Sequence, residues 1–119
     1  MPACGDQPVL ITDSNKRVSM LFLGIDVGSS SVKLSVLDGA SGKSLGALSH
    51  PESELAILSP AVGFAEQDPE TWWDCVRQGL ARLAARDNIA LDQIDAIGIS
   101  YQMHGLVLVD SNQQVLRPS

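Results

Sequence analysis

The segment GIDVGSSSVKLSVLD, residues 24–38, restricts the fold most, because it places two strand-like stretches on either side of a short polar interruption. Leu21 to Asp26 is a nearly continuous apolar run, which is typical of a strand buried on both faces. Ser31 to Asp38 alternates between apolar and polar residues, as a half-buried strand does. Its apolar side consists of Val32, Leu34 and Val36. The segment therefore predicts a tight antiparallel hairpin with a polar tip.

A third strand and a helix are expected after the hairpin. Gly39 to Gly42 is a turn cluster, and Lys43 to Ser49 alternates weakly, so the pattern predicts three antiparallel strands in a row. A helix then begins within DPETWWDCVRQGLARLAARDN, where Asp68 suits the N-cap and Pro69 the first helical position. The apolar spacing along this helix predicts one face that packs on the sheet. That face comprises Trp73, Val76, Leu80, Leu83 and Ala84.

The remaining segments return to strands. Ile94 to Ser100, IDAIGIS, is interpreted as a buried strand. After YQMHG, the apolar run Leu106 to Val109 and the pair Val115-Leu116 flank the turn residues Asp110-Ser111-Asn112, which predicts a further hairpin. The expected order is β-β-β-α-β followed by a hairpin, which places the chain in the α/β class.

The ends of the folded part follow from the same patterns. Residues 1–19 are polar and aperiodic, so we expect a disordered tail there. Met20 stands directly before the first strand, so the folded part is expected to span residues 20–119.

Charge and cysteine usage narrow the range of partners. The formal net charge of −6 argues against nucleic acid or an anionic membrane as the main partner, since both favour clustered Lys and Arg. A phosphorylated small ligand stays possible, because backbone N–H groups, a metal and one or two cations can hold it.

Cys4 and Cys75 are far apart, and with two histidines they form neither a disulfide framework nor a zinc motif. The sequence has no apolar run near the ~18 residues of a membrane span and no signal-peptide pattern, so we expect a cytoplasmic protein.

The hairpin tip carries the first candidate chemistry. Gly28 can adopt positive φ and allow a close approach to the backbone, and Ser29, Ser30 and Ser31 offer N–H groups and hydroxyls to an anion. Asp26 ends a buried strand, where a carboxylate needs solvent, a donor or a cation. With Mg²⁺ between Asp26 and a phosphate, usually through waters, and with Lys33 balancing charge, these residues make half of a nucleotide-phosphate site. A solvated serine-rich turn capped by an aspartate explains the same residues, so the loop alone leaves both interpretations open.

Three segments together resemble a known family. GIDVGSSSVKLSVLD, GFAEQDPETWWD and AIGISYQMHGLVLVDSNQQVLRPS occur in this order. The combination resembles the FGGY family of carbohydrate kinases, and xylulokinases in particular, from about Leu21 to Ser119. The resemblance implies the N-terminal part of the ribonuclease-H-like, actin-like ATPase fold. It also implies the use of ATP and Mg²⁺.

Roles for the tip residues are carried over from the resemblance. Asp26 would support Mg²⁺, through water, and the transferring phosphate, without being the catalytic base. The residues expected to line the β- and γ-phosphates of ATP are Gly28, Ser29, Ser30, Ser31 and Lys33.

The resemblance also implies that the turn after the last long strand holds the sugar, because Met103 and His104 match a Met-His pair that contacts the sugar in xylulokinases. Gln102 and His104 can exchange hydrogen bonds with sugar hydroxyls, and Met103 offers a pliable apolar contact. Without the resemblance, a histidine in a turn is most simply a polar surface residue. Glycerol kinases resemble this stretch but carry Arg-Glu in place of Met103-His104, whereas gluconokinases can carry Met-His. Many xylulokinases have glycine where this chain has Tyr101, and a phenol there is expected to affect substrate choice.

Other conspicuous residues have plainer explanations. Trp73 is expected in the core, whereas Trp72 points elsewhere and covers the neighbouring loop. Glu66, Gln67 and Asp68 look like catalytic groups, but Asp68 is better explained as the helix cap. Cys75 is expected to be a small buried filler.

The resemblance also indicates what is missing. Sugar phosphorylation needs a base that orients the attacking hydroxyl, and in this family it is an aspartate far downstream of the matching region. We therefore expect the chain to be an N-terminal fragment, inactive alone, of a kinase that transfers the γ-phosphoryl of ATP to a ketose. D-xylulose, giving D-xylulose 5-phosphate, is the expected substrate, and the full-length protein is a possible homodimer. The alternatives are gluconokinase, another FGGY sugar kinase, or a non-catalytic actin-like nucleotide-binding module.

Overall fold

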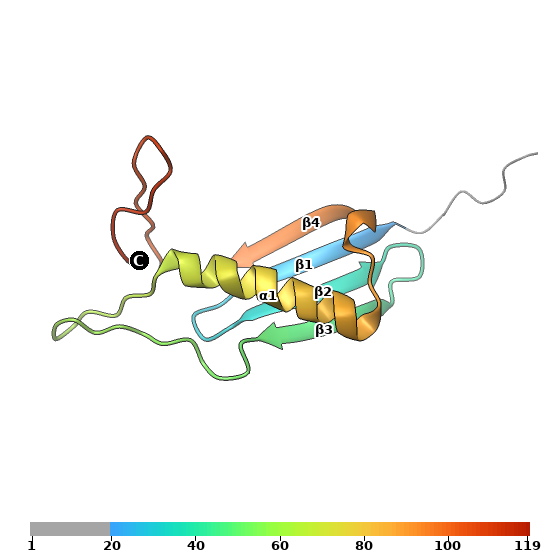
Figure 1. Cartoon of the computed structure of the whole chain (residues 1–119), viewed down its shortest axis with the longest axis horizontal. Coiled ribbons are helices and arrows are strands. Elements are labelled where there is room, and N and C mark those ends of the chain that lie inside the picture. Colours follow the sequence, from blue (N-terminus) through green and yellow to red (C-terminus); the bar gives the residue numbers. More distant parts are fainter. Residues whose placement is uncertain (1–19) are drawn as a thin grey trace, which may run out of the picture.

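The computed structural model describes residues 20–119, so the expected tail at residues 1–19 lies outside the described residues. Within this range one sheet of four strands has the order β3-β2-β1-β4, and helix α1 lies across one of its faces (Figure 1). The elements are β1 (Leu21–Val27), β2 (Val32–Asp38), β3 (Ser44–His50), α1 (Pro69–Asp87), the 3₁₀ helix η1 (Leu91–Gln93) and β4 (Ile94–Tyr101). The expected order β-β-β-α-β is confirmed.

The pairing of the strands decides which polar residues meet. β1 and β2 form the expected antiparallel hairpin, with Asp26 opposite Lys33. β4 pairs with the other edge of β1 in parallel, with Asp26 beside Ser100. Asp26 therefore lies in the middle of the sheet at the end of β1, flanked by one residue from each neighbouring strand.

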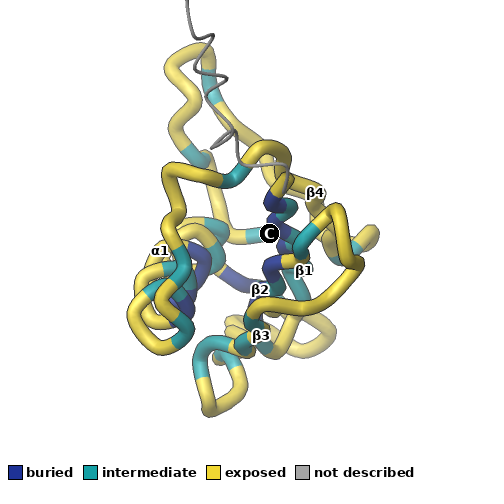
Figure 2. Tube along the Cα trace, turned by 90° about the vertical axis from the view of Figure 1, so that its right-hand side faces the viewer, coloured by how far each residue is buried: buried dark blue, intermediate teal, exposed yellow. Residues whose placement is uncertain are grey.

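The hydrophobic core lies between the sheet and α1 (Figure 2). The alternation predicted for β2 is confirmed, because Val32, Leu34 and Val36 on its apolar side are buried while Lys33 and Leu37 on the other side are exposed. β1 differs from the expectation of burial on both faces, since Phe22, Gly24 and Asp26 on its second face are only half-buried. The buried apolar residues of the core cluster are Leu23, Ile25, Val32, Leu34, Val36, Cys75, Val76 and Leu83.

Both ends of α1 are capped. Asp68 Oδ1 accepts a hydrogen bond of 3.0 Å from the Glu70 N–H, and Pro69 occupies the first helical position, as predicted. Asn88 ends the helix in the left-handed conformation, with φ of 52°. The helix boundaries thus follow from local sequence chemistry.

The helix face that meets the sheet agrees with the predicted one at Val76, Leu80 and Leu83 and differs from it at Trp73. Trp73 is 56% exposed, so its expected place in the core is wrong. The buried residues of α1 are Cys75, Val76, Gly79 and Leu83. A Cβ on Gly79 would lie 2.7 Å from Leu34 Cδ1, so this close helix–sheet approach has room only for the smallest residue. The packed face thus combines the predicted Val76 and Leu83 with the smaller Cys75 and Gly79, and the indole of Trp73 lies outside it.

β4 exists as predicted but is not buried. Ile97 and Ile99 are 59% and 63% exposed. The reason is that β4 is an edge strand, whereas α1 packs on β2 and β3. Ile97 and Ile99, which pair with Leu23 and Ile25 of β1, therefore stay uncovered. The alternation of apolar residues predicted the strand, but it could not predict which strands the helix covers.

The residues after β4 fold back towards the start of α1 (Figure 1). The expected hairpin is reduced to one bridge between Val109 and Val115 and a tight turn. Asp110 Oδ1 accepts hydrogen bonds from the N–H groups of Asn112 and Gln114, at 2.8 and 2.9 Å, which holds this turn closed. The last residues then run beside the segment that precedes the helix.

Candidate functional site

The hairpin tip is a closed turn. The Gly28 N–H donates to the Ser31 carbonyl oxygen over 3.1 Å. The expected positive φ at Gly28 is wrong, because among the described glycines only Gly42 and Gly63 have it. A Cβ on Gly28 would lie 3.0 Å from the Ser31 carbonyl oxygen. Glycine is therefore favoured here by the close approach of its own turn and not by a left-handed backbone.

Asp26 is fixed by its two neighbours in the sheet. Its Oδ1 accepts a hydrogen bond of 2.8 Å from Ser100 Oγ, and Lys33 Nζ lies 3.4 Å from its Oδ2. The Ser100 hydrogen bond, followed by the hydrogen bond and charge of Lys33, holds the pKa of Asp26 below its ordinary value. The carboxylate is 47% exposed. It is therefore ionised at neutral pH, oriented, and open to solvent on one side.

A hollow of about 780 Å³ surrounds this carboxylate. Since Leu23 and Ile25 face α1, the alternating residues Gly24 and Asp26 point to the opposite face of the sheet. The polar and small residues that line the hollow there are Gly24, Asp26, Lys33, Ser35, Ala47, Ser49, Gly98 and Ser100. The structure thus brings together Asp26 and Lys33, the lysine that the sequence analysis expected to balance charge at the tip.

The three serines of the tip have different environments. Ser29 and Ser30 are exposed, and their carbonyl oxygens accept hydrogen bonds from Gln67 Nε2 at 2.7 Å and from the Leu55 N–H at 2.8 Å. Ser31 Oγ lies 3.1 Å from Ser49 Oγ on β3. Gln67 and Leu55, which lie outside the hairpin, therefore hold the backbone of the tip, while the hydroxyls of Ser29 and Ser30 stay accessible.

A second, smaller hollow of about 220 Å³ joins the tip to the turn after β4. Ser29, Gln102 and His104 all line it, together with residues of the loop before α1 and the last residue. The Gln102 N–H donates to the Val27 carbonyl oxygen over 3.0 Å, which ties the second turn to the end of β1. Two of the three residues expected to bind sugar thus share a hollow with a residue expected to bind phosphate.

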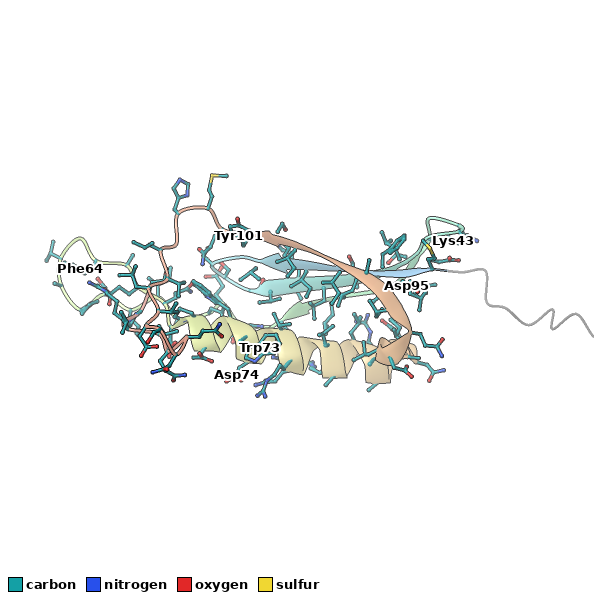
Figure 3. All side chains as sticks on the ribbon, turned by 90° about the horizontal axis from the view of Figure 1, so that it is seen from above. Lys43, Phe64, Trp73, Asp74, Asp95 and Tyr101 are labelled. Atoms are coloured by element: carbon teal, nitrogen blue, oxygen red, sulfur yellow. The ribbon has the colours of Figure 1, made fainter. Side chains whose placement is uncertain are left out.

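Met103 and Tyr101 lie elsewhere. Met103 is 82% exposed and is not among the residues that line this hollow. Tyr101 lies at the end of β4, and with Trp73 near the start of α1 it borders a separate apolar hollow of about 450 Å³ (Figure 3). The phenol therefore does not face the hollow that contains His104.

Two residues of this region escaped the sequence patterns. Ser100 was included in a strand but given no role, because its partnership with Asp26 depends on the parallel pairing of strands far apart in the sequence. Gln67 is buried and hydrogen-bonded to the tip, whereas the sequence analysis named it with Glu66 and Asp68 as a group that looks catalytic and assigned a role, the helix cap, only to Asp68. A glutamine directly before an N-cap aspartate was the only available signal.

Residues 20–119 contain no cluster of three or more His, Cys, Asp or Glu side chains placed to hold a metal ion. Within the same residues, no helix is both long and apolar enough to cross a membrane.

Comparison with known proteins decides the family. Residues 21–119 match the model of the N-terminal domain of the FGGY family of carbohydrate kinases. The chain belongs to this family. The resemblance inferred from three sequence segments is thereby confirmed, and the match covers β1 through the last residue.

Curated relatives of this FGGY chain include xylulose kinases. The xylulose kinase of Escherichia coli K12 is 36% identical over 99 residues, which is 83% of this chain and 19% of the relative. The xylulose kinase of Bacillus subtilis 168 is 39% identical over 95 residues, 80% of this chain and 18% of the relative. The chain therefore spans about a fifth of the length of these relatives.

Solved structures agree with the family assignment. A xyloylose kinase from Brucella ovis superposes with a TM-score of 0.73 at 38% identity, covering 82% of this chain and 20% of the other. A gluconate kinase from Lactobacillus acidophilus gives 0.69 at 28% identity, with 84% and 19% covered. FGGY kinases have the actin-like ATPase fold, so the expected fold class is confirmed, with this chain as a mixed α/β part of it.

Proposed function

We propose that this FGGY chain supplies the N-terminal portion of an ATP-dependent sugar kinase, with D-xylulose as the substrate. The observation that carries the proposal is the position of the ionised, oriented Asp26 at the end of β1, beside a hairpin tip whose Ser29 shares a hollow with Gln102 and His104. One end of this arrangement suits phosphates and the other suits hydroxyls. The xylulose kinases among the curated relatives support the choice of sugar.

The proposed reaction moves the γ-phosphoryl group of ATP to a sugar hydroxyl. A bond forms between the hydroxyl oxygen and the γ-phosphorus, the bond from that phosphorus to the β–γ bridging oxygen breaks, and ADP leaves. The proton of the hydroxyl passes to a base. Since the acids of residues 20–119 other than Asp26 lie in caps, turns, ion pairs or on the exposed surface, we assign the base to a part of the kinase outside this chain.

The residues at the tip fit an ATP·Mg²⁺ complex. Asp26 presents a half-exposed carboxylate, the oxygen type that Mg²⁺ prefers, and a single carboxylate is compatible with binding through water. Mg²⁺, when bound, neutralises charge on the phosphates. The N–H groups and hydroxyls of Ser29 and Ser30 would contact phosphate oxygens, and Lys33 would add a positive charge beside Asp26.

We assign sugar binding to the turn after β4, at residues 102–105. Gln102 and His104 would hydrogen-bond sugar hydroxyls, and Met103 would provide an apolar contact. Gluconate is the second candidate, because the gluconate kinase of L. acidophilus superposes with a TM-score of 0.69, which lies within the range of the xylulose kinase structures. Glycerol is disfavoured by the Met103-His104 pair.

The test is an ADP-release assay on the full-length kinase that we propose carries this chain. Xylulose, ribulose, gluconate and glycerol are supplied separately with ATP and Mg²⁺, and kcat/KM is compared. We expect xylulose to give the highest value. A higher kcat/KM for gluconate would replace the proposed substrate, and the absence of sugar-dependent ADP release from a folded protein would refute a kinase function.

A further inference from the structure

Gln67 is the one polar side chain that is buried among residues 20–119, with 8% exposure. It lies in the loop just before the N-cap of α1, between the two turns of the candidate site. Its Nε2 donates to the Ser29 carbonyl oxygen at 2.7 Å and to the Ala56 carbonyl oxygen at 3.3 Å. Its Oε1 accepts a hydrogen bond of 3.2 Å from Trp72 Nε1. Every hydrogen-bonding atom of the amide is therefore engaged.

The orientation of this amide follows from its partners. Carbonyl oxygens only accept hydrogen bonds, so the atom that faces Ser29 and Ala56 must be the NH₂ group. The indole N–H only donates, so the atom that faces Trp72 must be the oxygen. Of the common side chains of this length, only glutamine satisfies all three partners. A glutamate would match the shape and accept from Trp72, but it would oppose two carbonyl oxygens.

The backbone of Gln67 reaches the other turn. Its N–H donates to the Ser119 carbonyl oxygen at 2.8 Å, and its carbonyl oxygen accepts from the Ser119 N–H at 2.9 Å. Ser119 packs closely on Gly105, where an added Cβ would lie 3.1 Å from Ser119 Oγ. The same residue therefore holds the hairpin tip through its side chain and supports the Gln102–Gly105 turn through its main chain.

We infer that Gln67 is a positioning residue that sets the separation between the phosphate turn and the sugar turn. This inference rests on the proposed kinase function. Gln67 need not touch either substrate, because it acts through Ser29 at one end and through Ser119 and Gly105 at the other. Transfer depends on the alignment of the sugar hydroxyl with the γ-phosphorus, and a shift of about 1 Å can cost roughly 100-fold in rate.

A misplaced turn has a specific chemical consequence. If the sugar hydroxyl no longer lies in line with the γ-phosphorus, a water molecule competes for the same position. Attack by water gives ADP and inorganic phosphate in place of ADP and sugar phosphate. The ratio of sugar phosphate formed to ADP released therefore reports on positioning, whereas a loss of folded protein lowers both products equally.

The experiment compares Gln67→Glu with Gln93→Glu in the full-length kinase, at saturating sugar and ATP. Gln93 is an exposed glutamine of η1, so the control adds the same charge away from the site. For Gln67→Glu we expect kcat to fall about 10- to 100-fold and the sugar phosphate per ADP to fall at least about twofold, with both unchanged in the control. An unchanged ratio in Gln67→Glu would overturn the inference.

Two further outcomes are distinguished in the same experiment. If Gln67→Glu is recovered unfolded, Gln67→Met, which has similar length and no charge, is judged by the same ratio. If the unmodified kinase itself shows no sugar-dependent ADP release, the proposed function fails first, and the inference about Gln67 falls with it.

Discussion

Ser100 Oγ donates a 2.8 Å hydrogen bond to Asp26 Oδ1 across the parallel pair of β1 and β4. The two residues are 74 positions apart in the sequence, so the bond forms only when the sheet is complete. It fixes the rotamer of the carboxylate at the end of β1 and leaves one side of it open. Closing the sheet and orienting the carboxylate of Asp26 are thus the same event.

Removing the Ser100 hydroxyl should raise the pKa of Asp26. In the 119-residue chain, Ser100→Ala is expected to raise the pKa of Asp26 towards its ordinary value of 3.8, because the largest cause of the lowered pKa is lost. The titration of the Asp26 carboxyl carbon, followed by NMR, measures this directly. Ser53→Ala, in an exposed loop, is the control. An unchanged titration midpoint in Ser100→Ala would contradict the assigned cause.

The same substitution carries a pH dependence of stability. A carboxyl whose pKa is lower in the folded state contributes stability that is present above its unfolded pKa and is lost as the pH falls through the folded pKa. The free energy of unfolding should therefore be larger for the unmodified chain than for Ser100→Ala at pH 7, and this difference should shrink below about pH 4. Urea unfolding at pH 7 and pH 3 provides the comparison.

The charge of Asp26 is expected to be essential for phosphoryl transfer. Asp26→Asn keeps the shape of the side chain and can still accept a hydrogen bond from Ser100, but it removes the negative charge that we propose supports the metal and phosphate. In the full-length kinase, kcat/KM should fall roughly 100-fold or more while the melting temperature changes little. Asp92→Asn, in the exposed first turn of η1, serves as the control. Retained turnover in Asp26→Asn would exclude the proposed role.

Local patterns predicted the elements of the fold well, because their causes are local. The alternation in β2 and the caps Asp68 and Pro69 depend on neighbours within a few residues, and all are confirmed. The packed face of α1 depends on the sheet below it. Spacing correctly predicted Val76 and Leu83 on this face but also placed Trp73 there, whereas the close approach of Gly79 to Leu34 was not predicted.

The candidate site was predictable only in part for a similar reason. Asp26 and Lys33 face each other across a hairpin that the sequence makes evident. The partner of Asp26 on β4 and the hydrogen bonds of Gln67 join segments that are far apart in the chain, and only the topology brings them together. Composition and spacing contain no information on such pairs.

Of the two histidines, we expect only His104 to contribute to sugar binding. In the full-length kinase, His104→Ala should raise the KM for sugar about 3- to 10-fold, in line with the loss of one hydrogen bond, and should leave the KM for ATP nearly unchanged. The control is His50→Ala, since His50 does not line the hollow that contains Gln102 and His104, and contacts Gln78 and Arg82 instead. An equal rise in both KM values for His104→Ala would identify a structural residue.

The two tryptophans should differ in fluorescence, because Trp72 is half-buried and bonded to Gln67 while Trp73 is mostly exposed. These are the only tryptophans in the sequence, so Trp72→Phe and Trp73→Phe each leave a single emitter. In the 119-residue chain, the protein that retains Trp73 should emit at longer wavelength and be quenched more strongly by acrylamide. The reverse order would restore the original prediction that Trp73 belongs to the core.

Leu83 should be a major determinant of stability, because it is fully buried between α1 and the sheet. Leu83→Ala removes that packing and leaves a cavity, so we expect a loss of about 2 to 5 kcal/mol in the free energy of unfolding of the chain. Leu45→Ala, on the exposed side of β3, should cost less than about 1 kcal/mol. Urea unfolding measures both, and if Leu83→Ala does not fold, Leu83→Met should cost no more than about 1.5 kcal/mol. Equal losses for Leu83→Ala and Leu45→Ala would mean that the chain does not bury α1 against its sheet in this way.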